Sequence, residues 1–334
     1  MKKTYYLMNP GRLSRKDNTL RFTPVDEDGN EGQPRYLPVE NVEEFYCFGS
    51  LDANSSLYNF LGKNQIGVHF FDYYENYTGS FMPREHLLSG KLLVNQVKHH
   101  LSKSKRIELA RAFINGAAHN ILKNLMYYRN RGKDLDDAIA DIKLYSQQID
   151  VVPNIESLMG IEGNIRQRYY SEFDTIIQHF SMEGRSKQPP LNEVNALISF
   201  GNMMCYTQCL RAIQQTQLNP TISYLHTPGE RRFSLALDLA EIFKPMLVDR
   251  LIFSMLNRRE LKPDDFDAKV NAVVLKEKGK KAFVTGFEQR LSETIQHRSL
   301  GKSVSYRYLI RLECYKLVKH LMQIEDYKPF KMWW

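Results

Sequence analysis

The chain has 334 residues, of which 43% are hydrophobic and 25% charged, with 18 Gly, 13 Pro and 4 Cys. This near-average composition excludes disordered, collagen-like and low-complexity classes, and the length suits one large domain or two smaller ones. The longest uncharged run, residues 194–210, is too short and too polar to cross a bilayer. No apolar stretch follows the lysines at the start, so we expect a cytoplasmic protein without a membrane segment.

The net charge of +8 is unevenly distributed along the chain. Residues 1–90 hold 9 basic and 12 acidic side chains, whereas residues 91–334 hold 37 basic and 26 acidic ones. Attraction for a polyanion is therefore expected of the second part, and the change suggests a domain boundary near residue 90.

The first ninety residues read as strands separated by turns. Short β-branched or aromatic runs occur at 19–23, 44–48 and 67–73, and Asp28-Gly29-Asn30 is a turn signal. A β-rich domain over residues 1–90 is predicted.

From about Leu92 the apolar residues recur at three- and four-residue spacing, which indicates amphipathic helices. The first long helix runs through residues 107–125 and ends at Asn130-Arg131-Gly132. Further helices are expected at 134–149, 154–180, 191–217, 234–257, 263–272, 284–298 and 303–324. Residues 273–284, rich in lysine, break the pattern and are expected to form a small hairpin or a loop. The sequence therefore predicts an all-α-helical domain over residues 91–334.

Glu162-Gly163 lies inside one of these helices, beside its apolar stripe. A glycine in a helix costs about 0.5–1 kcal/mol relative to alanine, so close approach of another backbone or of a ligand is expected there. From spacing alone we favour an exposed ion pair on the surface between Glu162 and Arg166, one turn further on.

Asp238 and Glu241 lie three residues apart on a helix that is otherwise almost entirely apolar. Buried carboxylates require a cation or hydrogen-bond donors, because an uncompensated buried charge is costly. Pro245 removes the amide that would bond to the carbonyl of Glu241, so we expect the helix to kink at this turn.

His226 precedes this helix and is a candidate third ligand. If the helix began at Thr227, His226 would lie about 20 Å from Glu241 at 1.5 Å per residue. We therefore expect a turn over residues 227–233 and a helix that begins near Ser234. A single loop histidine is more often a hydrogen-bonded polar group than a ligand, so both interpretations stay open on spacing alone.

Glu, His and a second acidic residue from separate segments suit a hard divalent ion, Mg²⁺ or Mn²⁺, that activates a phosphodiester. Zinc is disfavoured, because Cys205 and Cys209 share a helix face without a nearby histidine and fit core packing instead. Basic clusters such as residues 98–106, 129–133 and 276–281 raise the expectation of nucleic-acid binding, although most such runs are only solvated faces.

At these residues the sequence resembles the CRISPR-associated adaptation integrase, the metal-dependent endonuclease called Cas-one, along nearly the whole chain. The motifs are Glu162-Gly163 followed by Tyr169, the segment 195–201, Leu225-His226, and the segment 234–245. The resemblance implies an α+β fold, in which an N-terminal β-sandwich-like domain joins an all-helical C-terminal domain. Arg166, where a small residue often stands, and Ser223-Tyr224 depart from the common pattern and mark a subtype, with type I-B as the candidate.

The resemblance implies that Glu162, His226 and Glu241 hold Mg²⁺ or Mn²⁺, and that Asp238 is a supporting acidic residue of the catalytic set. Candidate DNA contacts are Arg231, Arg232, Lys244 and Arg166.

The activity implied by the family is the joining of 3′-hydroxyl ends of short DNA fragments to the repeat of a CRISPR array, by transesterification. The implied partners are double-stranded DNA (spacer precursor and repeat), a second copy bound through the β domain, and the Cas-two protein. Two other interpretations remain: a metal-dependent nuclease acting on branched or single-stranded nucleic acid, and a non-catalytic DNA-binding scaffold in which the same four residues are structural.

Overall fold

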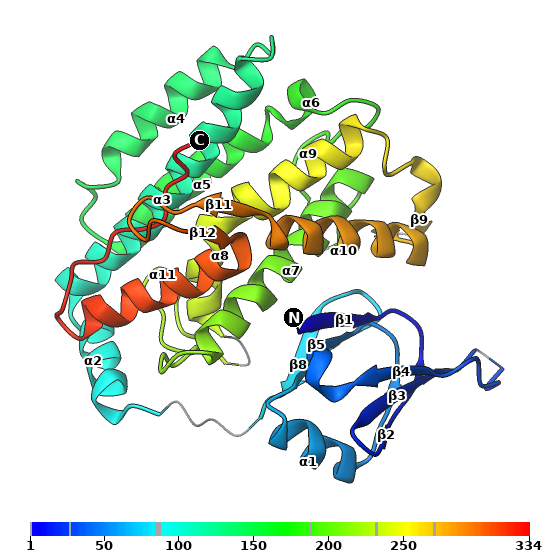
Figure 1. Ribbon diagram of the computed structural model, residues 1–334. Helices are drawn as coiled ribbons and strands as arrows, with labels where there is room; N and C mark the ends of the chain where they lie inside the picture. Colours follow the sequence, from blue (N-terminus) through cyan, green and yellow to red (C-terminus); the bar gives the residue numbers. More distant parts are fainter. Residues whose placement is uncertain (1, 27, 84–87, 187–188, 231–232, 270–271) are drawn as a thin grey trace. The chain divides into compact units, whose positions relative to one another are not determined.

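The computed structural model describes residues 2–26, 28–83, 88–186, 189–230, 233–269 and 272–334 (Figure 1). The chain divides into two compact units, Met1–His86 and Leu87–Trp334. The first contains strands in sheets and the second is helical, so the predicted α+β class is confirmed. Each unit is described by itself below.

The N-terminal unit contains two sheets of four described strands each. One sheet has the order β1–β5–β7–β8, with β8 antiparallel to β7 and the other neighbours parallel. Its strands are β1 (Lys3–Leu7), β5 (Val42–Cys47), β7 (Gly67–Phe71) and β8 (Tyr77–Phe81). The other has the order β4–β3–β2–β6, made of β4 (Arg35–Pro38), β3 (Thr19–Pro24), β2 (Gly11–Lys16) and β6 (Leu51–Asp52).

A single hydrophobic core lies between these sheets. It takes Leu13 and Phe22 from one sheet, Phe45 and Val68 from the other, and Leu61 from the helix α1 (Ser55–Lys63). Alternate residues of a strand point to opposite faces, so each sheet contributes one apolar face to this core. The arrangement is the β-sandwich-like domain that the resemblance implied. A 3₁₀ turn, η1 (Val39–Asn41), joins β4 to β5.

The second unit is a helical assembly with two small hairpins (Figure 1). The helices before the site are α2 (Gly90–Leu101), α3 (Lys103–Arg129), α4 (Asp136–Gln148), α5 (Ile155–Tyr170), α6 (Phe173–Ile176) and α7 (Glu193–Gln214). The elements from the site onward are α8 (Ser234–Lys244), the π-helical turn η2 (Pro245–Asp249), α9 (Arg250–Asn257), η3 (Pro263–Asp265), β9 (Phe266–Lys269), β10 (Ala272–Leu275), α10 (Glu277–Ser292), β11 (Thr294–Gln296), β12 (Ser303–Ser305) and α11 (Tyr306–Leu321). In the described part of the chain, no helix is long and apolar enough to cross a membrane.

Helix α8 packs against both α3 and α7, and nearly all of its side chains are buried. After Lys244 the chain does not stop at the proline but widens into the π-helical turn and continues as α9. The predicted disturbance at Pro245 is therefore found as a change of helical pitch, because a π turn accommodates a residue that cannot donate an amide hydrogen bond.

Side chains from neighbouring helices bind the carbonyls around this turn. Asn120 Nδ2 donates to the carbonyl of Ile242 at 2.9 Å, and Asn124 Nδ2 donates to the carbonyl of Pro245 at 2.7 Å. Arg290 Nε donates to the carbonyl of Met246 at 3.0 Å. A buried carbonyl without a donor is costly, so these side chains stabilise the altered pitch.

Three helix predictions need correction. The helix predicted at 263–272 is wrong, because Pro263 begins a 3₁₀ turn and the alternating residues that follow pair as the β9–β10 hairpin. The predicted 154–180 helix ends at Tyr170, followed by the short α6. Helix α10 begins at Glu277, earlier than predicted, since the buried Gly279, Phe283 and Phe287 recur at the four-residue spacing of a helix face.

Gly201, the glycine of α7, lies where that helix closely approaches Val248 of the π turn. A Cβ at Gly201 would lie 2.4 Å from Cγ1 of Val248 and 3.0 Å from the ring of Phe283. We predict that Gly201→Ala lowers the free energy of unfolding by about 1–3 kcal/mol through overpacking.

Gly160 is the matched control, since it also lies in a helix but a Cβ added there would meet open space. Gly160→Ala should leave stability equal or raise it by up to about 1 kcal/mol. Urea unfolding followed by circular dichroism measures both, and equal effects of the two substitutions would contradict the close approach.

Candidate functional site

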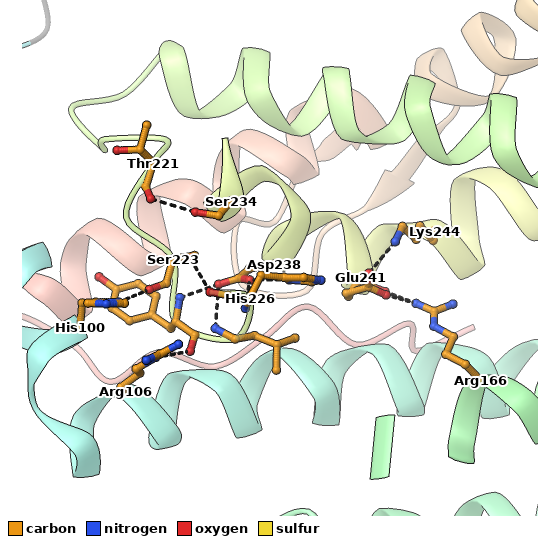
Figure 2. A network of polar contacts seen from close by, with 12 residues as sticks. His100, Arg106, Arg166, Thr221, Ser223, His226, Ser234, Asp238, Glu241 and Lys244 are labelled. Atoms are coloured by element: carbon orange, nitrogen blue, oxygen red, sulfur yellow. Dashed lines mark hydrogen bonds and ion pairs between the residues drawn. The ribbon is translucent and has the colours of Figure 1, made fainter. Parts of the chain in front are cut away.

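The loop that carries His226 is held by the carboxylate of Asp238, which is fully buried on α8. Oδ2 of Asp238 accepts the backbone amides of Tyr224 at 2.7 Å and Leu225 at 3.0 Å. Oδ1 accepts the amide of His226 at 2.9 Å and its Nδ1–H at 2.8 Å (Figure 2). Four donors thus stabilise the buried charge, and the loop is fixed on the first turns of α8.

The hydrogen bond to Asp238 also determines which ring nitrogen of His226 is available to a ligand. Because Nδ1 is bound to Asp238, the nitrogen that can face a ligand is Nε2. Burial by itself lowers the pKa of His226, but the hydrogen bond and charge of Asp238 raise the pKa above its usual value. The helix begins at Ser234, as the length argument required, so His226 reaches α8 from a loop.

The same loop is bound from its other side through its carbonyls. His100 Nδ1 lies 2.6 Å from the carbonyl of Ser223, and Arg106 Nε donates to the carbonyl of Tyr224 at 2.9 Å. Gln96 Nε2 donates to the carbonyl of Ile222 at 3.2 Å. These three side chains were not predicted from the sequence, because nothing in their spacing connects α2 and α3 to residues more than a hundred positions away.

Glu241 lies one turn further along α8 and is neutralised by two cations. Its carboxylate forms a short contact with Nη2 of Arg166 and accepts from Nζ of Lys244 at 2.5 Å (Figure 2). Burial alone would raise the pKa of Glu241, but Lys244 and Arg166 hold the pKa well below its usual range. Glu241 is therefore ionised, and its side chain is only 8% exposed.

Arg166 connects this carboxylate to Glu162. Its Nε donates to Oε1 of Glu162 at 3.1 Å, which is the ion pair that the spacing favoured. Both partners are largely buried, however, since the side chain of Glu162 is 19% exposed and that of Arg166 11%. One guanidinium therefore gathers carboxylates from α5 and α8. The expected close approach to Gly163 is not made by protein, because a Cβ there would meet open space.

The π turn that follows α8 carries a further buried carboxylate. Asp249, at the end of the π turn, is fully buried, and burial raises its pKa to about 7 although the charges of Arg166 and Lys244, and the nearby hydroxyl of Tyr169, oppose the rise. Among the described residues, neither oxygen of Asp249 has a hydrogen-bond partner of normal geometry, nor does Nη1 of Arg166. Asp249 was also not predicted from the sequence, although an acidic residue within an apolar run was a usable signal.

The side-chain chemistry fits a hard divalent ion, since two carboxylates and an imidazole oriented by a third carboxylate are ligands for Mg²⁺ or Mn²⁺. In the described part of the chain, however, no three His, Cys, Asp or Glu side chains are already grouped to hold a metal ion. The positive charge beside Glu162 and Glu241 comes instead from Arg166, and beside Glu241 also from Lys244.

The family model described as CRISPR associated protein Cas1 matches residues 5–289. A CRISPR-associated endonuclease Cas1 from Thermodesulfovibrio yellowstonii is 49% identical over 336 residues, covering 100% of both chains. The chain belongs to the Cas1 family. This is the family that the motifs resembled, so the family prediction is confirmed.

Solved structures show the same fold. A Cas1 protein from Thermotoga maritima superposes with a TM-score of 0.86 at 38% identity, covering 98% of this chain and 100% of that one. Two more distant structures share the fold. A casposase bound to its integration product has a TM-score of 0.85 at 21% identity, covering 98% of this chain and 93% of that one. A Cas6-RT-Cas1–Cas2 complex has a TM-score of 0.81 at 16% identity, covering 99% of this chain and 36% of that one.

The four candidate DNA contacts of this Cas1 chain fall into two pairs. Arg231 and Arg232 lie outside the described residues. Arg166 and Lys244 are buried in ion pairs with the site carboxylates, so in this conformation they neutralise protein charge. Their contact with DNA stays a prediction, as do the ligand roles of Glu162, His226 and Glu241.

Asp238→Asn tests how strongly the buried carboxylate organises the loop. The amide places an N–H against backbone N–H donors, so we expect the free energy of unfolding to fall by about 2–4 kcal/mol. The control Asp136→Asn changes an exposed carboxylate in the first turn of α4 and should shift stability by less than about 1 kcal/mol. Urea unfolding measures both, and an unchanged Asp238→Asn would refute the anchoring role.

Proposed function

We propose that this Cas1 protein is a metal-dependent DNA endonuclease and integrase of CRISPR adaptation, which joins the 3′-hydroxyl ends of short DNA fragments into the array. The observation that supports it most is that Arg166 joins Glu162 of α5 to Glu241 of α8, while Asp238 of the same helix α8 orients His226. A basic helical unit, in which residues 91–334 carry the excess of positive charge, suits a polyanionic substrate.

In this proposal Glu162, Glu241 and Nε2 of His226 hold Mg²⁺ or Mn²⁺, which when bound supplies positive charge to the attacked phosphate. Asp238 acts through His226, because it fixes the ring and its tautomer without facing substrate. Lys244, beside Glu241, is placed to offset the further negative charge of the phosphate.

The proposed reaction is a transesterification. The 3′-hydroxyl oxygen of the fragment attacks a phosphorus of the repeat, and the bond from that phosphorus to its former 3′ oxygen breaks. The attacking hydroxyl loses its proton and the departing oxygen gains one, so one phosphodiester replaces another without an energy source.

The proposed partners are double-stranded DNA, a second copy of the chain bound through the β-rich unit, and Cas2. The solved complex that contains Cas1 and Cas2, and the casposase bound to its integration product, have this fold and support a Cas2 partner and DNA binding. The second candidate, a nuclease that uses water as nucleophile, would employ the same residues and differ only in its products.

The deciding experiment follows a labelled short duplex with free 3′-hydroxyls into a supercoiled plasmid that carries a CRISPR array, in the presence of Cas2. We expect the label to join the plasmid with Mn²⁺ but not with EDTA, and the variant Glu162→Ala to be inactive. Nicking or degradation without joining would favour the nuclease, and binding alone would favour the scaffold.

His226→Ala should abolish joining, by at least about a hundredfold, while folding and DNA binding change little, because a loop side chain contributes little to the core. His297→Ala, which removes an imidazole from the segment between β11 and β12, is the matched control and should remain active. Joining rates, melting temperatures and DNA gel shifts are compared, and unfolding of His226→Ala would contradict its assigned role.

A further inference from the structure

We propose that Arg166 is a built-in counter-ion of the site, which neutralises Glu162 and Glu241 in the metal-free protein and transfers to Asp249 when a divalent ion binds. The inference rests on the proposed metal site, and it assigns to Arg166 and Asp249 a positioning role in loading that site.

Arg166 lies between the two carboxylates of the site. Its Nε donates to Glu162 at 3.1 Å and its Nη2 contacts Glu241, so adjacent donors of one planar group bind both carboxylates. Nη2 also lies 3.5 Å from the carbonyl of Glu241, the group that loses its amide partner at Pro245. The guanidinium thus occupies the position of charge that a metal ion bound to these carboxylates would take.

A metal ion added to this arrangement would meet a like charge. Like charges that lie close together in a buried site repel strongly, because the effective dielectric constant there is far below that of water. A divalent ion bound by Glu162 and Glu241 would therefore compete directly with Arg166, and the guanidinium must move for both carboxylates to turn to the ion.

Asp249 offers the guanidinium a second position. It is fully buried at the end of the π turn, which Asn124 joins to Tyr169 on the helix of Arg166. The Arg166 charge is the strongest influence that opposes the rise of its pKa. Both oxygens of Asp249 and Nη1 of Arg166 lack hydrogen-bond partners of normal geometry among the described residues. Buried polar groups are rarely left unpaired, so a buried donor of Arg166 and a buried carboxylate that both lack partners indicate where the guanidinium can go.

The test is the binding of Mn²⁺ to metal-free protein, measured by the electron paramagnetic resonance of free Mn²⁺ without DNA. Removal of the competing charge in Arg166→Gln should tighten binding by about tenfold or more, which corresponds to at least about 1.4 kcal/mol. Arg168→Gln is the matched control, since Arg168 lies on the same helix but pairs with Asp141 and Glu172 outside the site. Its affinity should equal that of wild type.

Asp249→Asn removes the destination and should weaken Mn²⁺ binding in the wild-type background. The double variant Arg166→Gln/Asp249→Asn separates this role from a general loss of negative charge. If Asp249 acts by receiving Arg166, the double variant binds as tightly as Arg166→Gln. If Asp249→Asn weakens binding equally in both backgrounds, the transfer is refuted.

A measurement on wild-type protein guards against variants that do not fold. The Nε–H resonance of Arg166 in ¹⁵N-arginine protein, assigned by its loss in Arg166→Gln or Arg166→Met, should shift when Mg²⁺ is added, and the Arg168 resonance should not. An unmoved Arg166 resonance at saturating Mg²⁺ would overturn the proposal. Wild type that binds no Mn²⁺ at all would instead overturn the proposed metal site, whereas wild type that binds as tightly as Arg166→Gln overturns the counter-ion alone.

Discussion

The burial of two carboxylates on one apolar helix is the constraint on which the site depends. Asp238 and Glu241 lie on α8, between α3 and α7, where an ionised group without partners would be costly. Each is compensated differently: Asp238 accepts four hydrogen bonds from one loop, and Glu241 contacts two cations. The hydrogen bonds of Asp238 order His226, and the Arg166 that neutralises Glu241 also binds Glu162. Compensation of two buried charges therefore assembles the site.

Pro245 has a similar double effect. It removes the amide that would bind the carbonyl of Glu241, and the chain responds with a π turn that changes the pitch of the helix between α8 and α9. The carbonyls of this region are then bound by side chains of α3, α5 and α10. The carbonyls freed by the change of pitch thus hydrogen-bond to three other helices, and these bonds hold Glu241 and Asp249 in buried positions.

These contacts also explain why membership of the Cas1 family does not by itself describe the site. The motif residues are present, yet in this conformation the positive charge between Glu162 and Glu241 belongs to Arg166. The motifs identify which side chains could bind a metal ion together. The charged side chains around them determine whether those carboxylates are available to the ion.

The sequence by itself determined the two-part α+β organisation, the start of α8 at Ser234 and the Glu162–Arg166 pair, because these follow from periodicity, helix length and i,i+4 spacing. The family followed from the resemblance of its motifs. Only the tertiary structure decided that Asp238 faces the loop of His226 and that Arg166 also reaches Glu241. It also decided that Asp249 is buried without a hydrogen-bond partner of normal geometry in the described part of the chain. It also replaced the predicted 263–272 helix with a hairpin, since pairing with a neighbouring strand outweighed local helical spacing. Local rules act over a few residues, whereas the His226–Asp238 and Arg166–Glu241 contacts join residues 12 and 75 positions apart, and only packing brings such residues together.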